Sequence, residues 1–258
     1  MSDKAFTWEF AGASDTGLVR PGNEDAIAWD AHFGLALLAD GMGGYEGGEI
    51  ASNLAIKTAL ESFSKPLAPH WREAEWTRKV NDAVLKLYAA VSEANLTVHN
   101  TALKQTRYEG MGTTFLAAYF HGDRATLAHI GDSRIYLWRN RALKQLTVDH
   151  TMVQERIENG EITAGDAASD AYRGVLTRAL GVDSVVEVDM REVSIQAGDV
   201  FLLCSDGCYD MLAYDDMAAI MSVYQEDPQQ LVRQLPWQLL AWPELSSPGP
   251  WQRLVSSP

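Results

Sequence analysis

Residues 33–41, with the sequence FGLALLADG, form a short apolar run that ends on an aspartate beside a glycine. The same pattern recurs in residues 125–132 (ATLAHIGD) and in residues 200–207 (VFLLCSDG). Short apolar runs bounded by turn residues are typical of buried strands. A glycine at the end of such a strand lets the backbone approach a ligand closely. The pattern therefore predicts three strands, each ending on one carboxylate: Asp40, Asp132 and Asp206.

Carboxylates gathered from several strand ends repel one another unless a cation lies between them. Ligation by oxygen atoms alone is what Mg²⁺ and Mn²⁺ prefer. The sequence therefore favours a divalent-metal site built from the ends of these strands. The alternative is that each Asp-Gly or Gly-Asp pair marks an ordinary hairpin turn that binds nothing.

Composition narrows the classes of function. The chain has 258 residues and is 47% hydrophobic, which suits one domain of ordinary density or two small ones. It carries 21 basic and 35 acidic residues, a net charge of −14, and no run of Lys or Arg stands out. This balance disfavours binding to nucleic acid or to an anionic membrane, and no apolar stretch reaches the ~18 residues of a membrane span. The acidity fits cation binding, and a solvated acidic surface explains it equally well.

Cysteine usage indicates a reducing compartment. The two cysteines, Cys204 and Cys208, are too few for a disulfide framework, and no secretory signal precedes Trp8. A Cys-x3-Cys pair without further soft ligands is a poor zinc signal, so we interpret both residues as core. We expect a cytoplasmic protein.

The order of predicted elements indicates a layered α+β fold. Strands come in runs and the two long helices come together, unlike the strict alternation of a parallel doubly wound sheet. Predicted strands cover residues 6–13, 25–29, 33–39, 111–119, 124–130, 134–138, 185–195 and 200–204. Predicted helices cover residues 49–63, 72–103 and 149–159, with short ones at 208–212, 215–223 and 228–235.

Seven short motifs, in this order, resemble those of the metal-dependent protein phosphatases, the PPM or type 2C serine/threonine phosphatases of bacterial type. One motif alone would be weak, but seven in the expected order are very specific, and the resemblance covers roughly residues 6–235. The motifs are RPGNED (20–25), ADGMGG (39–44), GMGTT (110–114), GDSR (131–134), LTVDHTM (146–152), LTRALG (176–181) and SDG (205–207).

The resemblance implies a four-layer α/β/β/α sandwich, with two central antiparallel sheets flanked by helices. It implies hydrolysis of phosphoserine and phosphothreonine in proteins with two or three Mn²⁺ or Mg²⁺ ions. Two such ions lower the pKa of a bridging water, which attacks phosphorus in line. The chain shows no Cys-x5-Arg nucleophile loop, which agrees with a metal-dependent route.

The resemblance also assigns the metal ligands. Asp40 corresponds to a carboxylate that bridges two metals, and Gly41 gives its backbone carbonyl to one of them. Asp206 binds the other metal. Asp132 matches the position that, together with Asp206, holds a third and weaker ion. Where some relatives carry a histidine proposed as the general acid, this chain has Met42, so the source of the proton stays open.

Three residues of the first motif are candidates for the catalytic machinery. Arg20 is suited to gripping the phosphate, because its planar fork can donate to two phosphate oxygens. Glu24 is expected to hold metal-bound waters, and Asp25 to have a supporting or structural role. For Thr113 and Thr114, and for the histidines, packing is the better interpretation; His150 in particular is expected to cap or pack.

Residues 149–173 match the flap that covers the site in this family. Relatives often show His-Pro where this chain has Asp170 and Ala171, so its flap contacts are expected to differ.

The C-terminal residues 236–258 depart from the family pattern. The family ends with a strand that carries an Asp-Asn-x-Ser/Thr motif, whose aspartate is a metal ligand. This stretch has no aspartate, five of the nine prolines and three tryptophans. So many prolines predict that no regular central strand forms, which leaves residues 6–235 as the phosphatase domain. One hypothesis is out-of-frame translation, which reading the other two frames would test; the other is a real tail that docks a partner.

The sequence therefore leaves three candidate functions. The first is a phosphoprotein phosphatase that opposes a serine/threonine kinase, with activity reduced or lost because a metal ligand is missing. The second is a pseudophosphatase that binds phosphoproteins without turnover. The third, a cation-binding scaffold, is disfavoured by Arg20 and its spacing to Glu24 and Asp25, because a scaffold needs no phosphate clamp.

Overall fold

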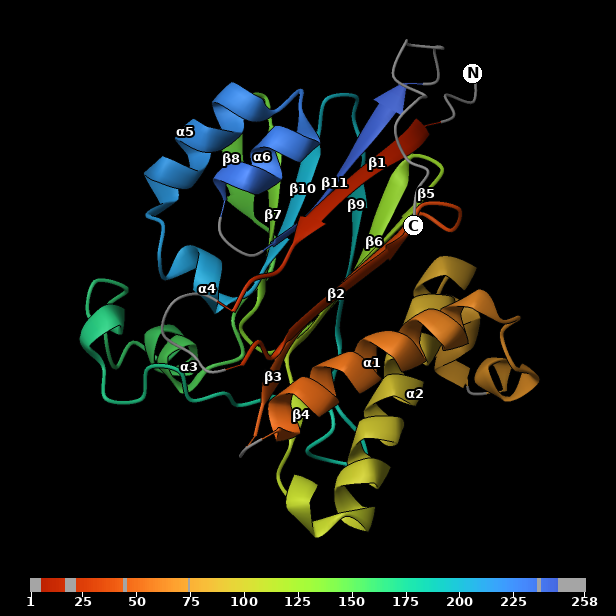
Figure 1. Cartoon of the computed structure of the whole chain (residues 1–258). Coiled ribbons are helices and arrows are strands. Elements are labelled where there is room, and N and C mark those ends of the chain that lie inside the picture. The colour runs from red at the N-terminus through yellow and green to blue at the C-terminus, as the bar shows by residue number, and fades with distance from the viewer. Residues whose placement is uncertain (1–5, 17–21, 44–45, 74, 236–237, 246–258) are drawn as a thin grey trace.

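The computed structural model describes residues 6–16, 22–43, 46–73, 75–235 and 238–245, the last range by its backbone alone. Its strands form two antiparallel sheets that pack face to face, and helices cover the outer face of each sheet (Figure 1). The prediction of an α+β fold with four layers, α/β/β/α, is confirmed.

The first sheet has the strand order β2-β3-β5-β6-β9, and the second has the order β1-β11-β10-β7-β8. Neighbouring strands in both are antiparallel. The first sheet comprises β2 (Asp25–Asp30), β3 (Leu35–Met42), β5 (Phe115–His121), β6 (Arg124–Ile130) and β9 (Asp189–Ser194), with β4 (Gly112–Thr113) paired to the end of β3. The second comprises β1 (Phe6–Ala13), β7 (Arg134–Arg139), β8 (Ala142–Gln145), β10 (Val200–Cys204) and β11 (Gln238–Leu245).

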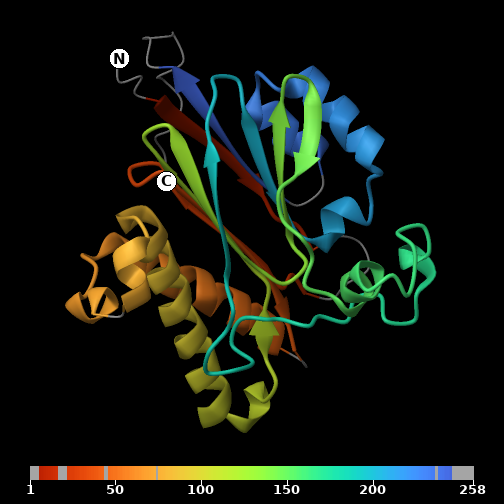
Figure 2. The ribbon, with the colours of Figure 1, turned by 180° about the vertical axis from the view of Figure 1, so that it is seen from behind.

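Two groups of helices complete the outer layers. The long helices α1 (Gly47–Ser64) and α2 (Asp82–Lys104) lie on the first sheet, and α4 (Asp206–Tyr209), α5 (Tyr214–Tyr224) and α6 (Pro228–Gln234) lie on the second. Helix α3 (Met152–Glu158) belongs to a segment that projects from the sandwich near α4 (Figures 1 and 2).

Strand β10 shows why the layers form. All five of its residues are buried, as a strand covered on both faces requires. Phe201 and Leu203 face the first sheet, whereas Val200, Leu202 and Cys204 pack against α4, α5 and α6. This alternation follows from the two-residue period of a strand. The two cysteines, Cys204 and Cys208, are both buried and free, in agreement with their interpretation as core residues.

Helix α2 and strand β9 begin well after their predicted starts at residues 72 and 185. Helix α2 begins at Asp82 because the side chain of Asn81 accepts a hydrogen bond from the backbone N–H of Val84, which caps the helix. The residues before it form two short 3₁₀ helices, Pro69–Arg72 and Glu75–Lys79. Strand β9 starts at Asp189, so residues 185–188 are a loop.

The prediction that no central strand follows Leu235 is wrong. Strand β11 lies between β1 and β10 and pairs with both. It contains only one of the five prolines, Pro243, which stands opposite Trp8 of β1. Pairing with β10 reaches only to Ala241, so Pro243 needs no partner on that side. The strand is therefore present, although the sequence after Leu235 still contains no aspartate.

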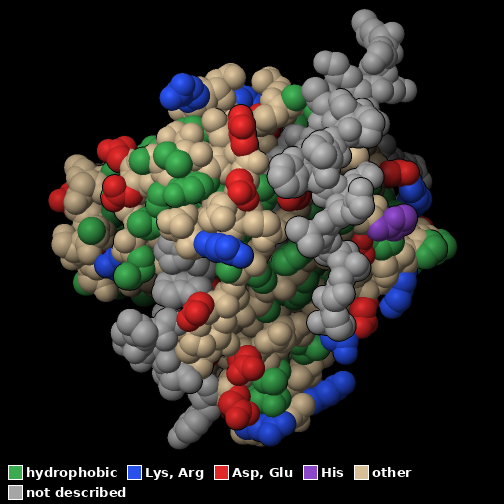
Figure 3. Space-filling view, turned by 45° about the horizontal axis from the view of Figure 1, so that its top comes forward, with side chains coloured by type: hydrophobic (Ala, Val, Ile, Leu, Met, Phe, Trp, Pro, Cys, Tyr) green, Lys and Arg blue, Asp and Glu red, His purple; other side chains and the backbone are tan. Residues whose placement is uncertain are grey.

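Acidic and basic side chains are interspersed with apolar ones on the face that Figure 3 presents. Within the described ranges, no helix combines the length and the apolar character that crossing a membrane requires.

Candidate functional site

A cavity of about 730 Å³ brings the predicted carboxylates together at one end of the sandwich. Glu24 enters from the residue before β2, Asp40 from the end of β3, Asp132 from the turn after β6 and Asp206 from the start of α4. Gly41 also lines the cavity. Strand ends from both sheets therefore converge on one site, as their sequence pattern predicted. Two predicted residues are not among its lining: Asp25 lies beside it, and Arg20 lies outside the described residues.

The backbone of Asp40 is held by two threonines, Thr113 at the end of β4 and Thr114 directly after it. Asp40 N–H donates to Thr114 Oγ1 at 2.9 Å, and the Asp40 carbonyl accepts from Thr114 N–H and from Thr113 Oγ1, both at 2.8 Å. Thr114 Oγ1 also lies 2.7 Å from Ser133 Oγ, next to Asp132. The threonines thus connect two of the carboxylate-bearing loops. From the sequence alone, packing is the expected role of both threonines. No local pattern reports these hydrogen bonds, because they join residues more than 70 positions apart.

Glycines allow three backbone segments to meet beside Glu24. A Cβ atom at Gly41 would overlap the carbonyl of Gly48, and one at Gly48 would overlap the carboxylate of Glu24. Gly41 N–H donates to the Glu24 carbonyl at 3.0 Å, which fixes Glu24 beside β3. Glycine is required at both positions by this close approach rather than by an unusual backbone angle.

Asp25 connects the two sheets. It stands directly opposite Asp40 in the pairing of β2 with β3, and its Oδ2 accepts a hydrogen bond from Ser205 Oγ at 2.7 Å. Ser205 is buried and immediately precedes Asp206. Asp25 therefore links the two sheets: its backbone pairs with the strand that carries Asp40, and its side chain binds the residue before Asp206.

The ionised form of Asp132 is energetically unfavourable in the folded chain. Burial, together with the negative charges of Asp206 and Asp149, raises the pKa of Asp132 from 3.8 to about 6. The Asp132 carbonyl accepts a hydrogen bond from the Tyr209 hydroxyl at 3.1 Å, and burial raises the pKa of Tyr209 so that it keeps its proton. A cation near Asp132 would offset the repulsion between the carboxylates.

Arg134 organises the groups behind Asp132. Its guanidinium donates to both carboxylate oxygens of Asp149, at distances from 2.6 to 3.1 Å. The same guanidinium lies 3.7 Å from the centre of the Tyr209 ring. Paired and stacked in this way, Arg134 compensates Asp149 and supports the tyrosine that holds Asp132.

The donor set fits a hard divalent cation. At one end of the sandwich, the cavity brings together the carboxylates of Glu24, Asp40, Asp132 and Asp206 and the backbone of Gly41, which is the oxygen-only ligation that Mg²⁺ and Mn²⁺ take. The raised pKa of Asp132 points the same way, because a nearby dication favours the charged form of a carboxyl group.

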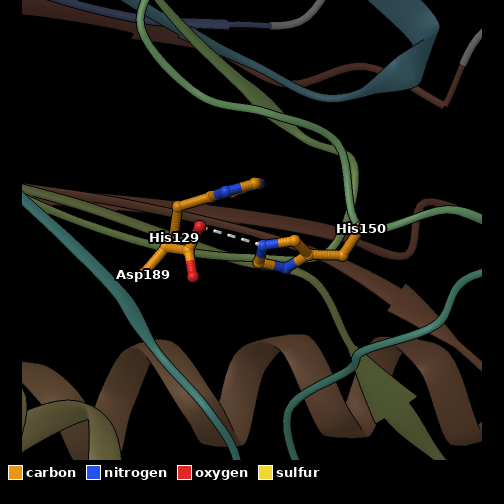
Figure 4. A group of neighbouring side chains, drawn as sticks. All are labelled: His129, His150 and Asp189. Atoms are coloured by element: carbon orange, nitrogen blue, oxygen red, sulfur yellow. Dashed lines mark ion pairs between the residues drawn. The ribbon is translucent and has the colours of Figure 1, made fainter. Parts of the chain in front are cut away.

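A second group of potential ligands comprises His129, His150 and Asp189, whose side chains lie close together (Figure 4). Asp189 on β9 stands opposite His129 on β6, and the ring of His150 lies 4.5 Å from that of His129. Gly131 N–H donates to His150 Nδ1 at 3.1 Å, so the proton of neutral His150 resides on Nε2, which lies 3.3 Å from Asp189 Oδ2.

This protonation state disfavours a metal ion at the second group. His150 has no free lone pair to offer, and Arg178 places a positive charge 3.0 Å from Asp189 Oδ1. Instead, His150 forms two hydrogen bonds with Gly131. Its ring Nδ1 accepts from the Gly131 N–H, and its backbone N–H donates to the Gly131 carbonyl at 2.8 Å. Gly131 has φ +98° and precedes Asp132, so the histidine fixes the turn that presents this carboxylate. The sequence predicts that His150 caps or packs, whereas in the structure it also positions the turn before Asp132.

His129 is buried, and neither of its ring nitrogens forms a hydrogen bond of normal geometry among the described residues. The nearby backbone of Gly131 and Ser133 acts on its pKa only weakly compared with burial. Burial, followed by the proximity of His150, lowers the pKa of His129 to about 3, so it is neutral at pH 7. An unsatisfied polar side chain in the interior lowers the stability of the fold.

The predicted flap, residues 149–173, borders a smaller cavity of about 360 Å³ on the other side of the carboxylates. Asp132 and Asp206 line both cavities. The flap is closed on itself by Arg156 and Asp170, 2.5 Å apart, and its last residue, Arg173, pairs at 2.9 Å with the exposed Asp210, which follows α4. Asp170, one of the positions where the family pattern is broken, thus forms an ion pair within the flap.

Comparisons with known proteins agree with this architecture. The model of the protein phosphatase 2C family matches residues 20–236. The serine/threonine phosphatase stp of Listeria monocytogenes is 35% identical over 211 residues, which are 81% of this chain and 81% of that one. A crystal structure of the Mycobacterium tuberculosis serine/threonine phosphatase PstP superposes with a TM-score of 0.76 at 35% identity, covering 93% of this chain and 99% of that one.

A second PstP structure is particularly informative about the site. It contains the catalytic domain in complex with two manganese ions and is 34% identical, with a TM-score of 0.75 and coverage of 92% of this chain and 97% of that one. The resemblance that the sequence motifs indicated is confirmed: the chain belongs to the protein phosphatase 2C family.

Proposed function

We propose that this chain is a metal-dependent phosphatase that hydrolyses the phosphate esters of serine and threonine residues in proteins. The observation that carries the proposal is the single cavity into which Glu24, Asp40, Gly41, Asp132 and Asp206 all project. Its family membership and the names of its relatives, which are serine/threonine phosphatases, support the same reaction.

Asp40, Gly41, Asp132 and Asp206 are the proposed ligands of two or three Mn²⁺ or Mg²⁺ ions. When bound, such ions supply positive charge that lowers the pKa of a coordinated water and stabilises charge on phosphoryl oxygens. The support for these ligands is the set of oxygen donors in the cavity, together with the burial and the carboxylate repulsion that raise the pKa of Asp132.

The remaining candidates act around these ligands. Arg20 is proposed to grip the phosphate through its planar fork of donors. Glu24, held between Gly41 and Gly48, is proposed to orient water beside the ions. Asp25 is proposed to be a positioning residue: the hydrogen bond that it accepts from Ser205 fixes the ligand-bearing ends of the two sheets relative to each other.

The proposed substrate indicates which other enzyme acts on the same proteins. Phosphoserine and phosphothreonine in proteins are the products of protein kinases, so we propose that this chain opposes a serine/threonine kinase in the cytoplasm.

A Mn²⁺ titration with a phosphothreonine peptide tests the proposal. We expect hydrolysis that rises with Mn²⁺ and disappears with EDTA or in Asp40→Ala. Asp123→Ala is the matched control, because Asp123 precedes β6 whereas Asp132 follows it, at the opposite end of the strand. Hydrolysis that persists in EDTA, or that Asp40→Ala leaves intact, would contradict a metal-dependent mechanism.

One observation favours a second candidate, a pseudophosphatase that binds phosphoproteins. The residues after Leu235 include β11 but no aspartate, so one family ligand has no counterpart. We therefore propose weaker metal binding and slower turnover than in an intact relative. Peptide binding without turnover at millimolar Mn²⁺, in folded protein, would favour this candidate, and turnover as fast as that of an intact relative would exclude impairment.

A further inference from the structure

One wall of the carboxylate cavity presents apolar side chains to solvent. Val182, Val185 and Val186, in the loop between Gly181 and β9, line the same cavity as the carboxylates. Val182 is 46% exposed and Val185 is 79% exposed. Single exposed apolar residues are ordinary, but two that border a polar site are a feature that a substrate can use.

This loop is anchored, so the exposure of its valines is built into the fold. Gly181 N–H donates to Asn95 Oδ1 at 2.7 Å, and Asn95 Nδ2 donates to the Asp183 carbonyl at 3.0 Å. Asn95 is buried on α2, and His99 on the same helix places Nδ1 3.1 Å from the Val182 carbonyl. Two side chains of one helix thus hold the loop in place while its valines face the cavity.

The same loop carries negative charge. Asp183 and Glu187 are exposed and line the cavity. Arg178 is a cationic member of this lining, but it lies 3.4 Å from Glu187 and 3.0 Å from Asp189, so two carboxylates compensate it. Asp183 forms no ion pair within the described part of the chain. The wall therefore combines apolar surface with an excess of negative charge.

We propose that residues 182–187 bind the substrate residues that flank the phosphorylated serine or threonine, and that they select an apolar residue accompanied by a basic one. The inference rests on the proposed function and concerns the substrate of that same site. The cavity volume is that of a site for a drug-sized ligand, which leaves room for neighbours of the phosphate. Acidic flanking residues would meet Asp183 and Glu187 and be repelled.

Phosphothreonine peptides with different flanks test the proposal. The reference peptide has only glycine around the phosphothreonine, and the others carry Leu, Arg, Leu with Arg, or Asp on either side. We expect kcat/KM for the best Leu-containing peptide to exceed that of the reference by about tenfold, as apolar contacts in enzyme pockets give. Adding Arg should raise it further, and Asp should lower it below the reference.

Two variants locate the preference. Val185→Ser should bring the ratio of kcat/KM for the Leu peptide to that for the reference peptide towards one. Val223→Ser is the matched control, because Val223 is also a highly exposed valine, 69%, but lies on α5 away from the cavity lining. It should keep the wild-type ratio. A wild-type ratio near one, or a ratio that Val185→Ser leaves unchanged, would overturn the proposal.

Failure of the proposed function gives a different result. If no peptide is hydrolysed, the phosphatase assignment fails, and fluorescence anisotropy with non-hydrolysable phosphonate versions of the same peptides decides about the wall. Tighter binding of the Leu peptide, lost in Val185→Ser and kept in Val223→Ser, would support the proposal in a protein that only binds. Equal affinity for all flanks would overturn it.

Discussion

Replacing Asp132 with asparagine should stabilise the metal-free protein while weakening its metal site. Burial and two neighbouring carboxylates raise the pKa of Asp132 from 3.8 to about 6. A change of one in pKa is worth about 1.4 kcal/mol, so ionising Asp132 in the folded chain costs about 3 kcal/mol. Asparagine has a similar shape and no charge, so the variant avoids this cost.

The sign of the pH dependence follows from the direction of the shift. Because the pKa is raised on folding, the folded chain binds more protons than the unfolded chain between about pH 4 and pH 6. The free energy of unfolding of the wild type therefore falls as the pH rises through this window. The advantage of Asp132→Asn should widen by about 2 kcal/mol between pH ~4.5 and pH ~7.5.

Urea denaturation in EDTA at several pH values measures this difference. The matched control is Asp199→Asn, because Asp199 is buried and pairs with Arg139 at 2.6 Å. Breaking that pair should destabilise the fold by about 3 kcal/mol or more at neutral pH. Mn²⁺ should then stabilise the wild type more than Asp132→Asn, because the variant lacks one proposed ligand. A variant no more stable than the wild type at pH ~7.5, or a difference independent of pH, would refute the electrostatic reasoning.

Four further variants probe other parts of the structure. Gly41→Ala should cost at least about 3 kcal/mol of stability in urea denaturation, since its Cβ would overlap the Gly48 carbonyl; a normal midpoint would refute the close approach. His150→Phe should weaken Mn²⁺ binding about tenfold in isothermal titration by releasing the turn before the metal site, and unchanged affinity would contradict the two-point hold. His129→Leu should raise stability by about 1 kcal/mol, because it removes the buried ring nitrogens that lack partners; a loss of stability would indicate a partner that this interpretation lacks. Deleting residues 236–258 should abolish the cooperative thermal transition by removing β11, whereas a folded, cooperative product would show that the strand is dispensable.

The local parts of the fold and site could be predicted from the sequence. Asp40, Asp132 and Asp206 each follow an apolar run and stand beside a glycine, so the signal for each lies within a few residues. The roles of Thr114 and His150 could not be predicted in this way. Thr114 contacts Asp40 of β3, 74 positions away, and His150 contacts the turn at Gly131, 19 positions away. Neither residue type has a local sequence pattern that reports such a contact.

The wrong prediction for the C-terminal strand has a specific physical cause. The five prolines are spread over the whole of residues 236–258, whereas a strand needs only those N–H groups that its neighbours use. Only Pro243 falls within β11, and it lies beyond the stretch that pairs with β10. Similarly, the sequence predicts a helix from residue 72, but the cap at Asn81 decides where the helix begins.

The position of β11 also constrains how the protein can be made. Among the strands that the structure describes, β11 leaves the ribosome last, yet it is the partner that separates β1 from β10. Until it arrives, β1 has no neighbour in its sheet, and one edge of the apolar strand β10 stays open to other chains. The nascent protein therefore carries an unfinished sheet through most of its synthesis, and its yield in a cell should depend on chaperones that shield this gap.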